Sequence, residues 1–307
     1  MEGEIISALE QFSIIKDLIG VEKVLELFKR DEKSPFIYYL EKSLVDEDRV
    51  KKLLEDLKDN PGHIGILILL DLNLNKYYIM KHLNSNLAYI KSHEKLDRFI
   101  EHLLDSSSFW QGYTEIEISA YLKKLFGCIE LEPLLPNGKS VDVKYSNNGQ
   151  DYYIEITVPK AWYKYEKEIK KSAEKGIAVE LEDSTDRACE KILDEVAHFD
   201  GVLDDVKSII IINLNETEFD EIEIEDCLLG ISKLVFMKNS KTGEFIGTRV
   251  DREKWTAFDI DERLQKIGLI ISYKRDFALN GNVVFNKKMF IVSFSEKDYV
   301  PLEKLFE

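Results

Sequence analysis

Hydrophobic residues in the first hundred positions recur every three or four residues, which is the spacing of a helix that buries one face. The clearest series is Ile5, Leu9, Phe12, Ile15 and Ile19. Similar patterns follow, and breaks such as Asn60-Pro61-Gly62 separate them. They cover residues 21–28, a short segment after Ser34-Pro35, 46–59, 64–74, 77–90 and 94–105. We therefore expect residues 1–105 to form an all-helical domain.

The pattern changes at Asp105-Ser-Ser-Ser108, where short apolar runs typical of strands begin to alternate with helical patterns. The apolar centre of Val206–Asn213 is typical of a strand in the middle of a sheet. We therefore expect residues 106–307 to form an α/β domain with a C-terminal extension. The expected elements are helices at 110–126, 186–199 and 221–229, and strands at 129–132, 140–145, 152–158, 206–213, 233–237, 269–273, 283–285 and 290–294.

Acidic residues outnumber basic ones, 58 to 42, and the formal net charge is -16. This balance opposes non-specific adhesion to nucleic acid or to anionic membranes. The longest apolar run, Ile64–Leu70, is too short to cross a bilayer. The acidic N-terminus lacks the charge pattern of a signal peptide. We expect a soluble cytoplasmic protein with no membrane partner.

Cysteine and histidine are few and show none of the usual metal-binding spacings. Cys128, Cys189 and Cys227 are odd in number and far apart, which argues against a zinc cluster and favours a reducing compartment. The five histidines form no HxxH or HExxH pattern, and we assign no role to His198 at the end of its expected helix. No GxGxxG or complete P-loop motif indicates a nucleotide-binding fold.

Asp142 and Glu155 are flanked by apolar residues in the two strands of the expected hairpin, where a carboxylate is costly without a partner. Side chains alternate along a strand, so Asp142 and Lys144 share one face. With a turn centred between Asn148 and Gly149, Asp142 lies opposite Glu155 at about 5 Å between Cβ atoms. Two carboxylates that close repel unless a cation lies between them or one binds a proton. Oxygen ligands at this spacing suit Mg²⁺ or Mn²⁺.

The order of these residues resembles the PD-(D/E)xK nuclease superfamily, which has the restriction-endonuclease-like fold. Glu115 or Glu117 matches the glutamate on the first helix of that fold. Val141-Asp142 matches the PD element, with valine in place of proline. Glu155-Ile156-Thr157 matches the (D/E)xK element, with threonine in place of lysine. The expected helix and strand after the hairpin also fit the order of that core, and the resemblance covers residues 110–215.

The resemblance implies a mixed sheet flanked by helices and metal-dependent hydrolysis of phosphodiester bonds in DNA or RNA. It implies that Asp142, Glu155 and Glu115 hold Mg²⁺ or Mn²⁺, with the Ile156 carbonyl completing the coordination shell. Thr157 cannot supply the positive charge of the family's lysine. Two nearby lysines are candidates for that role, and they are Lys144 on the face of Asp142 and Lys160 just beyond the strand.

The segment Lys160–Lys175 interleaves lysines with Trp162, Tyr163 and Tyr165. Basic and aromatic side chains together can follow a phosphate backbone and stack on bases, so this segment is the candidate nucleic-acid contact. The alternative is a solvated helix with ion pairs four residues apart. The N-terminal helical domain is the candidate contact for a protein partner, and the sequence indicates no oligomeric state.

Three alternatives remain open at this stage. Thr157 and the acidic net charge are also compatible with a catalytically inactive module that binds nucleic acid or a protein on the same fold. The hairpin pattern is also compatible with a different α/β protein. Glu115 and Glu117 can be ordinary surface residues near a helix start, where the helix dipole favours acids.

Arg187 and Lys191, four residues apart on the expected helix, can face the site.

Overall fold

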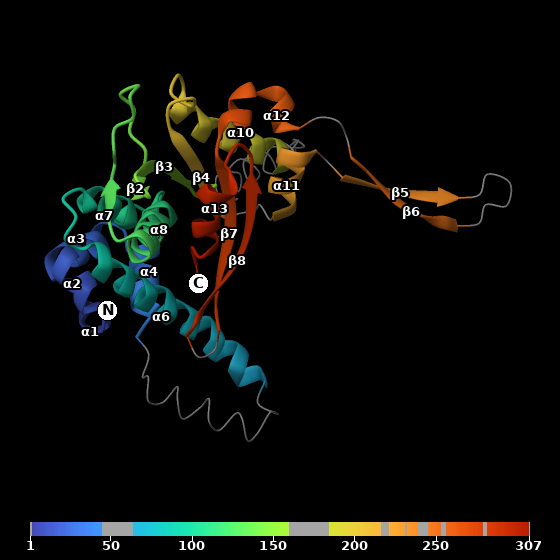
Figure 1. Cartoon of the computed structure of the whole chain (residues 1–307). Helices are drawn as coiled ribbons and strands as arrows, with labels where there is room; N and C mark the ends of the chain where they lie inside the picture. Colours follow the sequence, from blue (N-terminus) through green and yellow to red (C-terminus); the bar gives the residue numbers. More distant parts are fainter. Residues whose placement is uncertain are drawn as a thin grey trace, which may run out of the picture. The chain divides into compact units, whose positions relative to one another are not determined.

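The computed structural model describes residues 2–44, 64–159, 184–215, 221–230, 232–238, 245–252, 256–278 and 281–306. The chain has an α/β fold, with an N-terminal helical region and a mixed sheet flanked by helices (Figure 1). It divides into two compact units, and each is described separately. The first comprises residues 1–131, 275–285 and 305–307, and the second comprises residues 132–274 and 286–304. The predicted helix 46–59 and the segment Lys160–Lys175 lie outside the described residues.

The first unit is built mainly from helices, and it extends past the all-helical domain predicted for residues 1–105 to include α8 and β1. Its elements are α1 (Glu2–Glu10), α2 (Ser13–Ile19), α3 (Val21–Arg30), α4 (Pro35–Lys42), α6 (Ile64–Ile90), α7 (Leu96–Leu104), α8 (Phe109–Phe126) and β1 (Ile129–Leu131). The prediction of two helices at 64–74 and 77–90 was wrong, because no glycine or proline interrupts α6 between them. Asn84 in α6 accepts hydrogen bonds from the backbone N–H groups of Ile14 and Ile15 at the start of α2.

The second unit holds most of the sheet and the helices that cover it. Its elements are β2 (Val143–Asn147), β3 (Gln150–Thr157), α10 (Ser184–Val196), the 3₁₀ helix η1 (Ala197–Phe199), β4 (Lys207–Asn213), α11 (Glu221–Leu229), β5 (Ser232–Lys238), β6 (Phe245–Arg252), α12 (Ala257–Ile260), η2 (Glu262–Lys266), β7 (Leu269–Phe277), β8 (Val283–Ile291) and α13 (Glu296–Glu303). The ends of β7 and β8 that face their connecting turn belong to the first unit. Strand β6 was not predicted, and β8 is continuous where two strands at 283–285 and 290–294 were expected.

The six-stranded sheet has the order β1-β2-β3-β4-β7-β8, and β5 and β6 form a separate antiparallel pair. Strands β2 and β3 are antiparallel, whereas β4 runs parallel to both β3 and β7. Ile209 to Ile212 in β4 are fully buried, which confirms the predicted central strand. The turn of the hairpin is Asn148-Gly149, and both residues have the positive φ angles that a tight two-residue hairpin turn requires.

One face of this sheet packs against α10, η1, α11 and α12. The apolar side chains of Ile210, Ile212 and Ile270 from the sheet join a core that includes Ile192 and Val196 from α10. Glu155 shares this face of the sheet, because its parallel neighbour in the sheet is Ile210. The acidic side chain of Glu155 is therefore placed beneath a helix rather than toward solvent.

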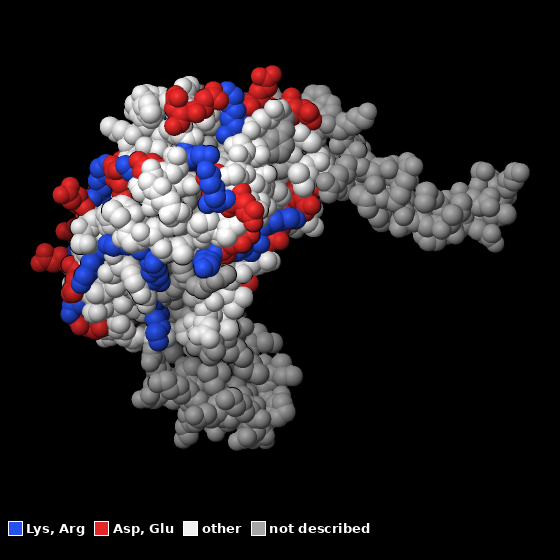
Figure 2. All heavy atoms as spheres, in the orientation of Figure 1, with Lys and Arg blue, Asp and Glu red and all other residues white. Residues whose placement is uncertain are grey.

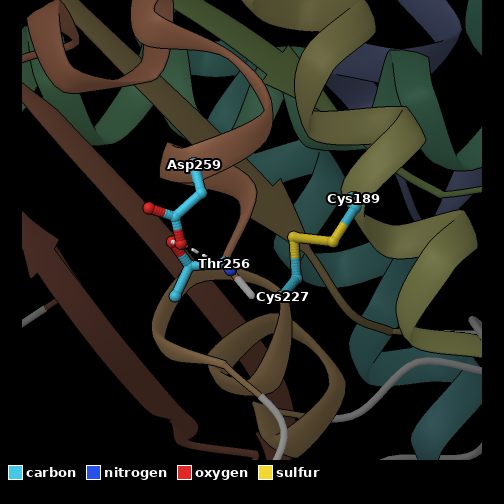
Figure 3. Close-up of a disulfide and its surroundings, with 4 residues drawn as sticks. All are labelled: Cys189, Cys227, Thr256 and Asp259. Carbon is cyan, nitrogen blue, oxygen red and sulfur yellow. Dashed lines mark hydrogen bonds between the residues drawn. A yellow bond between two sulfur atoms is a disulfide. The ribbon is translucent and has the colours of Figure 1, made fainter. Parts of the chain in front are cut away.

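Helices α10 and α11 are joined by a disulfide between Cys189 and Cys227, shown in Figure 3. Cys227 is buried, and Cys128 is exposed and has no disulfide partner among the described residues. The sequence had indicated no pairing of cysteines, because a separation of 38 residues gives no local signal. No helix within the described parts of the chain is long and apolar enough to cross a membrane.

Replacing Gly112 with alanine is expected to destabilise the first unit by about 3 kcal/mol, because an added methyl group overpacks a tight contact. A Cβ atom at Gly112 in α8 would lie 2.4 Å from the backbone nitrogen of Leu103 in α7. Gly3 in α1 has open space around it and serves as the control. Chemical denaturation should show a large decrease in the free energy of unfolding for Gly112→Ala and a small increase for Gly3→Ala. Equal stabilities of the two variants would contradict this packing.

Breaking the Cys189–Cys227 bond with a reductant is expected to lower the free energy of unfolding by roughly 4 kcal/mol, because the bond closes a long loop in the unfolded chain. The same reductant should leave the stability of Cys189→Ala unchanged, and Cys128→Ser should respond as the wild type does. Thiol titration of the denatured, non-reduced protein should detect Cys128 alone. Detection of three thiols would show that the bond does not form.

Candidate metal centre

Asp142 lies directly before β2, because the strand predicted at 140–145 begins only at Val143, and Glu155 lies within β3. Val143 and Ile154 form the last pair of the hairpin ladder, and Asp142 and Glu155 are the next residues along the two segments. Each residue is only 6% exposed. The Asp142 carboxylate accepts a hydrogen bond of 2.8 Å from the backbone N–H of Ile156, so it lies against β3 at the position of Glu155. The hairpin therefore buries two carboxylates in adjacent places.

Two further side chains reach Glu155 from the helix that covers it. Glu195 near the end of α10 is 5% exposed, and His198 follows in η1. The His198 Nδ1 atom lies 3.5 Å from the Glu155 Oε1 atom. One ligand atom from each of Glu155, Glu195 and His198 can be chosen so that all three lie within 4.8 Å of one another. We call these three residues the α10 cluster.

Polar contacts hold the backbone of η1 next to the loop that precedes β2. The Asn137 side-chain amide donates to the carbonyl oxygens of His198 and Asp200, at 3.0 and 2.9 Å. The Lys139 ammonium donates to the carbonyl of Ala197 at 2.7 Å. The His198 Nδ1 atom also lies 3.3 Å from the carbonyl oxygen of Ser140. The position of the imidazole thus depends on this loop as well as on α10.

A lysine side chain already contacts the α10 cluster. Lys191 forms an ion pair with Glu195 one turn along α10, and its side chain is 36% exposed. This agrees with the expectation that Lys191 can face the site. The side chain of Arg187 lies outside the described residues. The buried carboxylate of Glu195 is therefore neutralised by a cation that also reaches solvent.

Glu115 and Glu117 lie in the first unit and are engaged there. Glu115 contacts His102 Nδ1 at 2.9 Å and accepts from the Gln111 side-chain amide at 3.0 Å. Glu117 accepts from the Arg275 guanidinium at 2.7 Å. The reading of both glutamates as ordinary surface residues was wrong, because each is almost fully buried in the body of α8.

The buried ion pair of Glu117 and Arg275 lies within an aromatic shell. The Arg275 guanidinium is 4.3 Å from the ring centroid of Tyr113, which is fully buried. His82 Nδ1 lies 3.3 Å from Glu117, but burial dominates and lowers the pKa of His82 to about 4, so this imidazole is neutral near pH 7. Burial raises the pKa of Tyr121, whose hydroxyl lies 3.4 Å from His82, to about 12. A permanently charged guanidinium on Glu117 makes this cluster a structural ion pair rather than a metal site.

The remaining predicted site residues are placed as follows. Lys144 shares the face of Asp142, but its ammonium lies 3.8 Å from Asp151, toward the turn end of the hairpin. Thr157 is buried, and Ile156 meets Asp142 through its N–H group. Lys160 lies outside the described residues.

The sequence analysis did not select Glu195 and set His198 aside. The search for metal motifs covered pairs of histidines, whereas these residues form a Glu-x-x-His pair. Residues three apart lie on the same side of a helix, and Glu-x-x-His pairs of this kind bind metal in some helical proteins. That spacing was readable in the sequence, but its relation to Glu155 was not.

Three comparisons with known proteins found no match to this chain. No family model matches it, no curated protein matches it, and no solved structure matches its fold.

The His102–Glu115 contact is expected to stabilise the protein at low pH and to lose this effect as the pH rises. The hydrogen bond to Glu115 raises the pKa of His102 above its usual value of 6.5. The stabilisation is then complete below pH 6.5 and is lost as the pH rises through the folded-state pKa. The difference in unfolding free energy between wild type and His102→Gln should therefore shrink as the pH rises from below 6.5 through the raised pKa of the folded state.

His93→Gln provides a control, because its effect on stability should depend on pH in the opposite direction. Burial lowers the pKa of His93, so its neutral form is favoured in the folded protein and its contribution is lost as the pH falls. A difference for His102→Gln that does not change with pH would show that the imidazolium form does not bind Glu115.

Proposed function

We propose that this chain is a metal-dependent phosphodiester hydrolase that acts on DNA or RNA, with its reaction centre at Asp142 and Glu155. The observation that carries the proposal is the burial of these two carboxylates at the same end of one hairpin, next to its last paired residues Val143 and Ile154. The order of elements supports it as well. Helix α8, strand β1, the β2–β3 hairpin, helix α10 and strand β4 follow one another as the PD-(D/E)xK resemblance requires.

The residues present are suited to hold a divalent cation. Asp142 and Glu155 supply oxygen atoms, and burial makes two neighbouring carboxylates costly unless positive charge lies close to them. Mg²⁺ or Mn²⁺ bound there would lower the pKa of a bound water and neutralise charge on a phosphate. Glu115, which the resemblance adds to the ligand set, contacts His102 and Gln111, and the proposal rests on Asp142 and Glu155 alone.

Within this proposal the protein's own side chains position the metal ligands and the substrate. The Ile156 N–H fixes the orientation of the Asp142 carboxylate. Thr157 supplies no positive charge, so Lys144 and Lys160 remain the proposed partners of the substrate phosphate. Lys144 would have to leave Asp151 for this, and its partial exposure at the hairpin surface permits that movement.

Nucleic acid is proposed as the substrate because of the lysines and aromatic residues of Lys160–Lys175. On the face drawn in Figure 2, the described basic side chains are interspersed with acidic ones. Charge on that face therefore does not add to the argument, which depends on the sequence of this segment. A protein partner of the N-terminal helices and a cytoplasmic location stay predictions.

A second candidate function is a catalytically inactive module that binds nucleic acid or a protein. The contacts of the site favour it in one respect, since Asp142, Glu155 and Glu195 each already have a partner within the protein. Thr157 at the position of the family's lysine favours it as well.

The test is cleavage of fluorescently labelled single- and double-stranded DNA and RNA by the full chain with Mg²⁺ or Mn²⁺. Glu155→Gln and Asp142→Asn should each lower the rate by about 100-fold or more, because they remove ligand charge while keeping side-chain shape. In Asp142→Asn the amide oxygen of the new side chain can still accept a hydrogen bond from the Ile156 N–H. Asp194→Asn, a neighbour of Glu195 in α10, should cleave as the wild type does.

Two results would count against the hydrolase. Cleavage that persists in both Asp142→Asn and Glu155→Gln would place the reaction centre elsewhere. A wild-type protein that binds nucleic acid or metal but cleaves none of the four substrates would favour the inactive module.

A further inference from the structure

We infer that Glu195 and His198 join Glu155 to form a site for a divalent transition metal, which the imidazole makes selective for Zn²⁺ or Mn²⁺ over Mg²⁺. The use of this site in catalysis rests on the proposed function, whereas the binding of metal does not. It changes the expected ligand set, because two of the three side chains come from α10 and η1 rather than from the hairpin.

The backbone arrangement brings the three side chains to one place. Glu195 and His198 are three residues apart and turn toward the same side of the helix. That side meets Glu155, because the Nδ1 atom of His198 lies 3.5 Å from the Glu155 carboxylate. The loop before β2 binds the backbone of η1 through Asn137 and Lys139. Elements on both sides of the cluster are thus fixed by hydrogen bonds and by the core beneath α10.

The spacing of the ligand atoms is close to that around an ion. Ligand atoms on one Zn²⁺ or Mn²⁺ lie roughly 3 to 4 Å apart, given bonds of about 2.0 to 2.2 Å. The three atoms here lie within 4.8 Å of one another, so a pair at that limit would approach by about 1 Å on binding. The His198 side chain is 42% exposed and has room to make this movement.

The donor set determines which ion is favoured. Carboxylate oxygens accept Mg²⁺ and transition metals alike, whereas an imidazole nitrogen favours transition metals. For one set of nitrogen and oxygen ligands, Zn²⁺ binds more tightly than Mn²⁺. We therefore expect the order of affinity Zn²⁺, then Mn²⁺, then Mg²⁺.

The alternative is that these residues are ion pairs and nothing more, with Lys191 on Glu195 and His198 on Glu155. The two readings differ in what Lys191 does. An ammonium on Glu195 competes with a metal for the same oxygen atoms, and its partial exposure lets it move into solvent when a metal binds. If the site binds metal, removing the Lys191 ammonium should strengthen metal binding. If Lys191 and Glu195 form only an ion pair, the same change should lower the stability of the protein and leave metal binding unimproved.

The experiment measures binding of Zn²⁺, Mn²⁺ and Mg²⁺ to the full chain by calorimetric titration. All variants carry Cys128→Ser, because the exposed thiol of Cys128 is itself a zinc ligand. Glu195→Gln and His198→Gln should each weaken Zn²⁺ and Mn²⁺ binding by at least about tenfold. Lys191→Met should strengthen it, and Asp194→Asn should leave it unchanged. Thermal melts of each metal-free variant establish that the protein is folded.

A spectroscopic measurement identifies the imidazole directly. Pulsed electron paramagnetic resonance of bound Mn²⁺ should show coupling to a nitrogen nucleus in the wild type, and this coupling should be lost in His198→Gln. Unchanged affinity in folded Glu195→Gln and His198→Gln, or Mn²⁺ bound without nitrogen coupling, would overturn the inference.

These outcomes are separable from those of the hydrolase test. Metal binding that needs His198, in a protein that cleaves no nucleic acid, would support this site and count against the proposed function. Cleavage that needs Asp142 and Glu155, together with metal binding that does not change in the Glu195 and His198 variants, would support the proposed function and count against this site.

Discussion

The arrangement of the second unit depends on one constraint, which is that the carboxylate of Glu155 is buried under a helix. A buried charge is stable only when opposite charge or hydrogen-bond donors lie close to it. Its neighbours on the β4 side of the sheet are Ile210 and, beyond it, Ile270 in β7, and their side chains are apolar. Helix α10 and the 3₁₀ helix that continues it must therefore present polar groups at this point, and they present Glu195, His198 and Lys191.

The two units compensate their buried acids in different ways. In the first unit Glu117 binds Arg275, which is itself buried, carries a permanent charge and is packed against Tyr113. That ion pair has no means of exchanging its cation. In the second unit the compensating groups are a lysine and a histidine that both reach solvent. The Lys191 ammonium on Glu195 can therefore be exchanged for another cation, and this difference separates a structural ion pair from a candidate metal centre.

The disulfide adds a second restraint on the helix that carries these ligands. Cys189 lies in α10 six residues before Glu195, and Cys227 lies in α11. The capping box of Thr256 and Asp259 fixes the start of α12, which belongs to the same core (Figure 3). Covalent and apolar contacts thus act on one side of α10, while the loop at Asn137 and Lys139 acts at its end.

The sequence alone determined the local geometry of the hairpin. Asn148-Gly149 tolerates positive φ angles, and a strand repeats every two residues, so the hairpin register, in which Val143 pairs with Ile154, follows from nearby positions. Only the tertiary structure decided which other residues meet them. Glu195 and His198 lie some forty residues away along the chain, and their approach to Glu155 depends on which face of the sheet α10 covers. Periodicity tells which side chains share a face, but it does not tell which faces meet, because that depends on long-range packing among elements whose local patterns are alike.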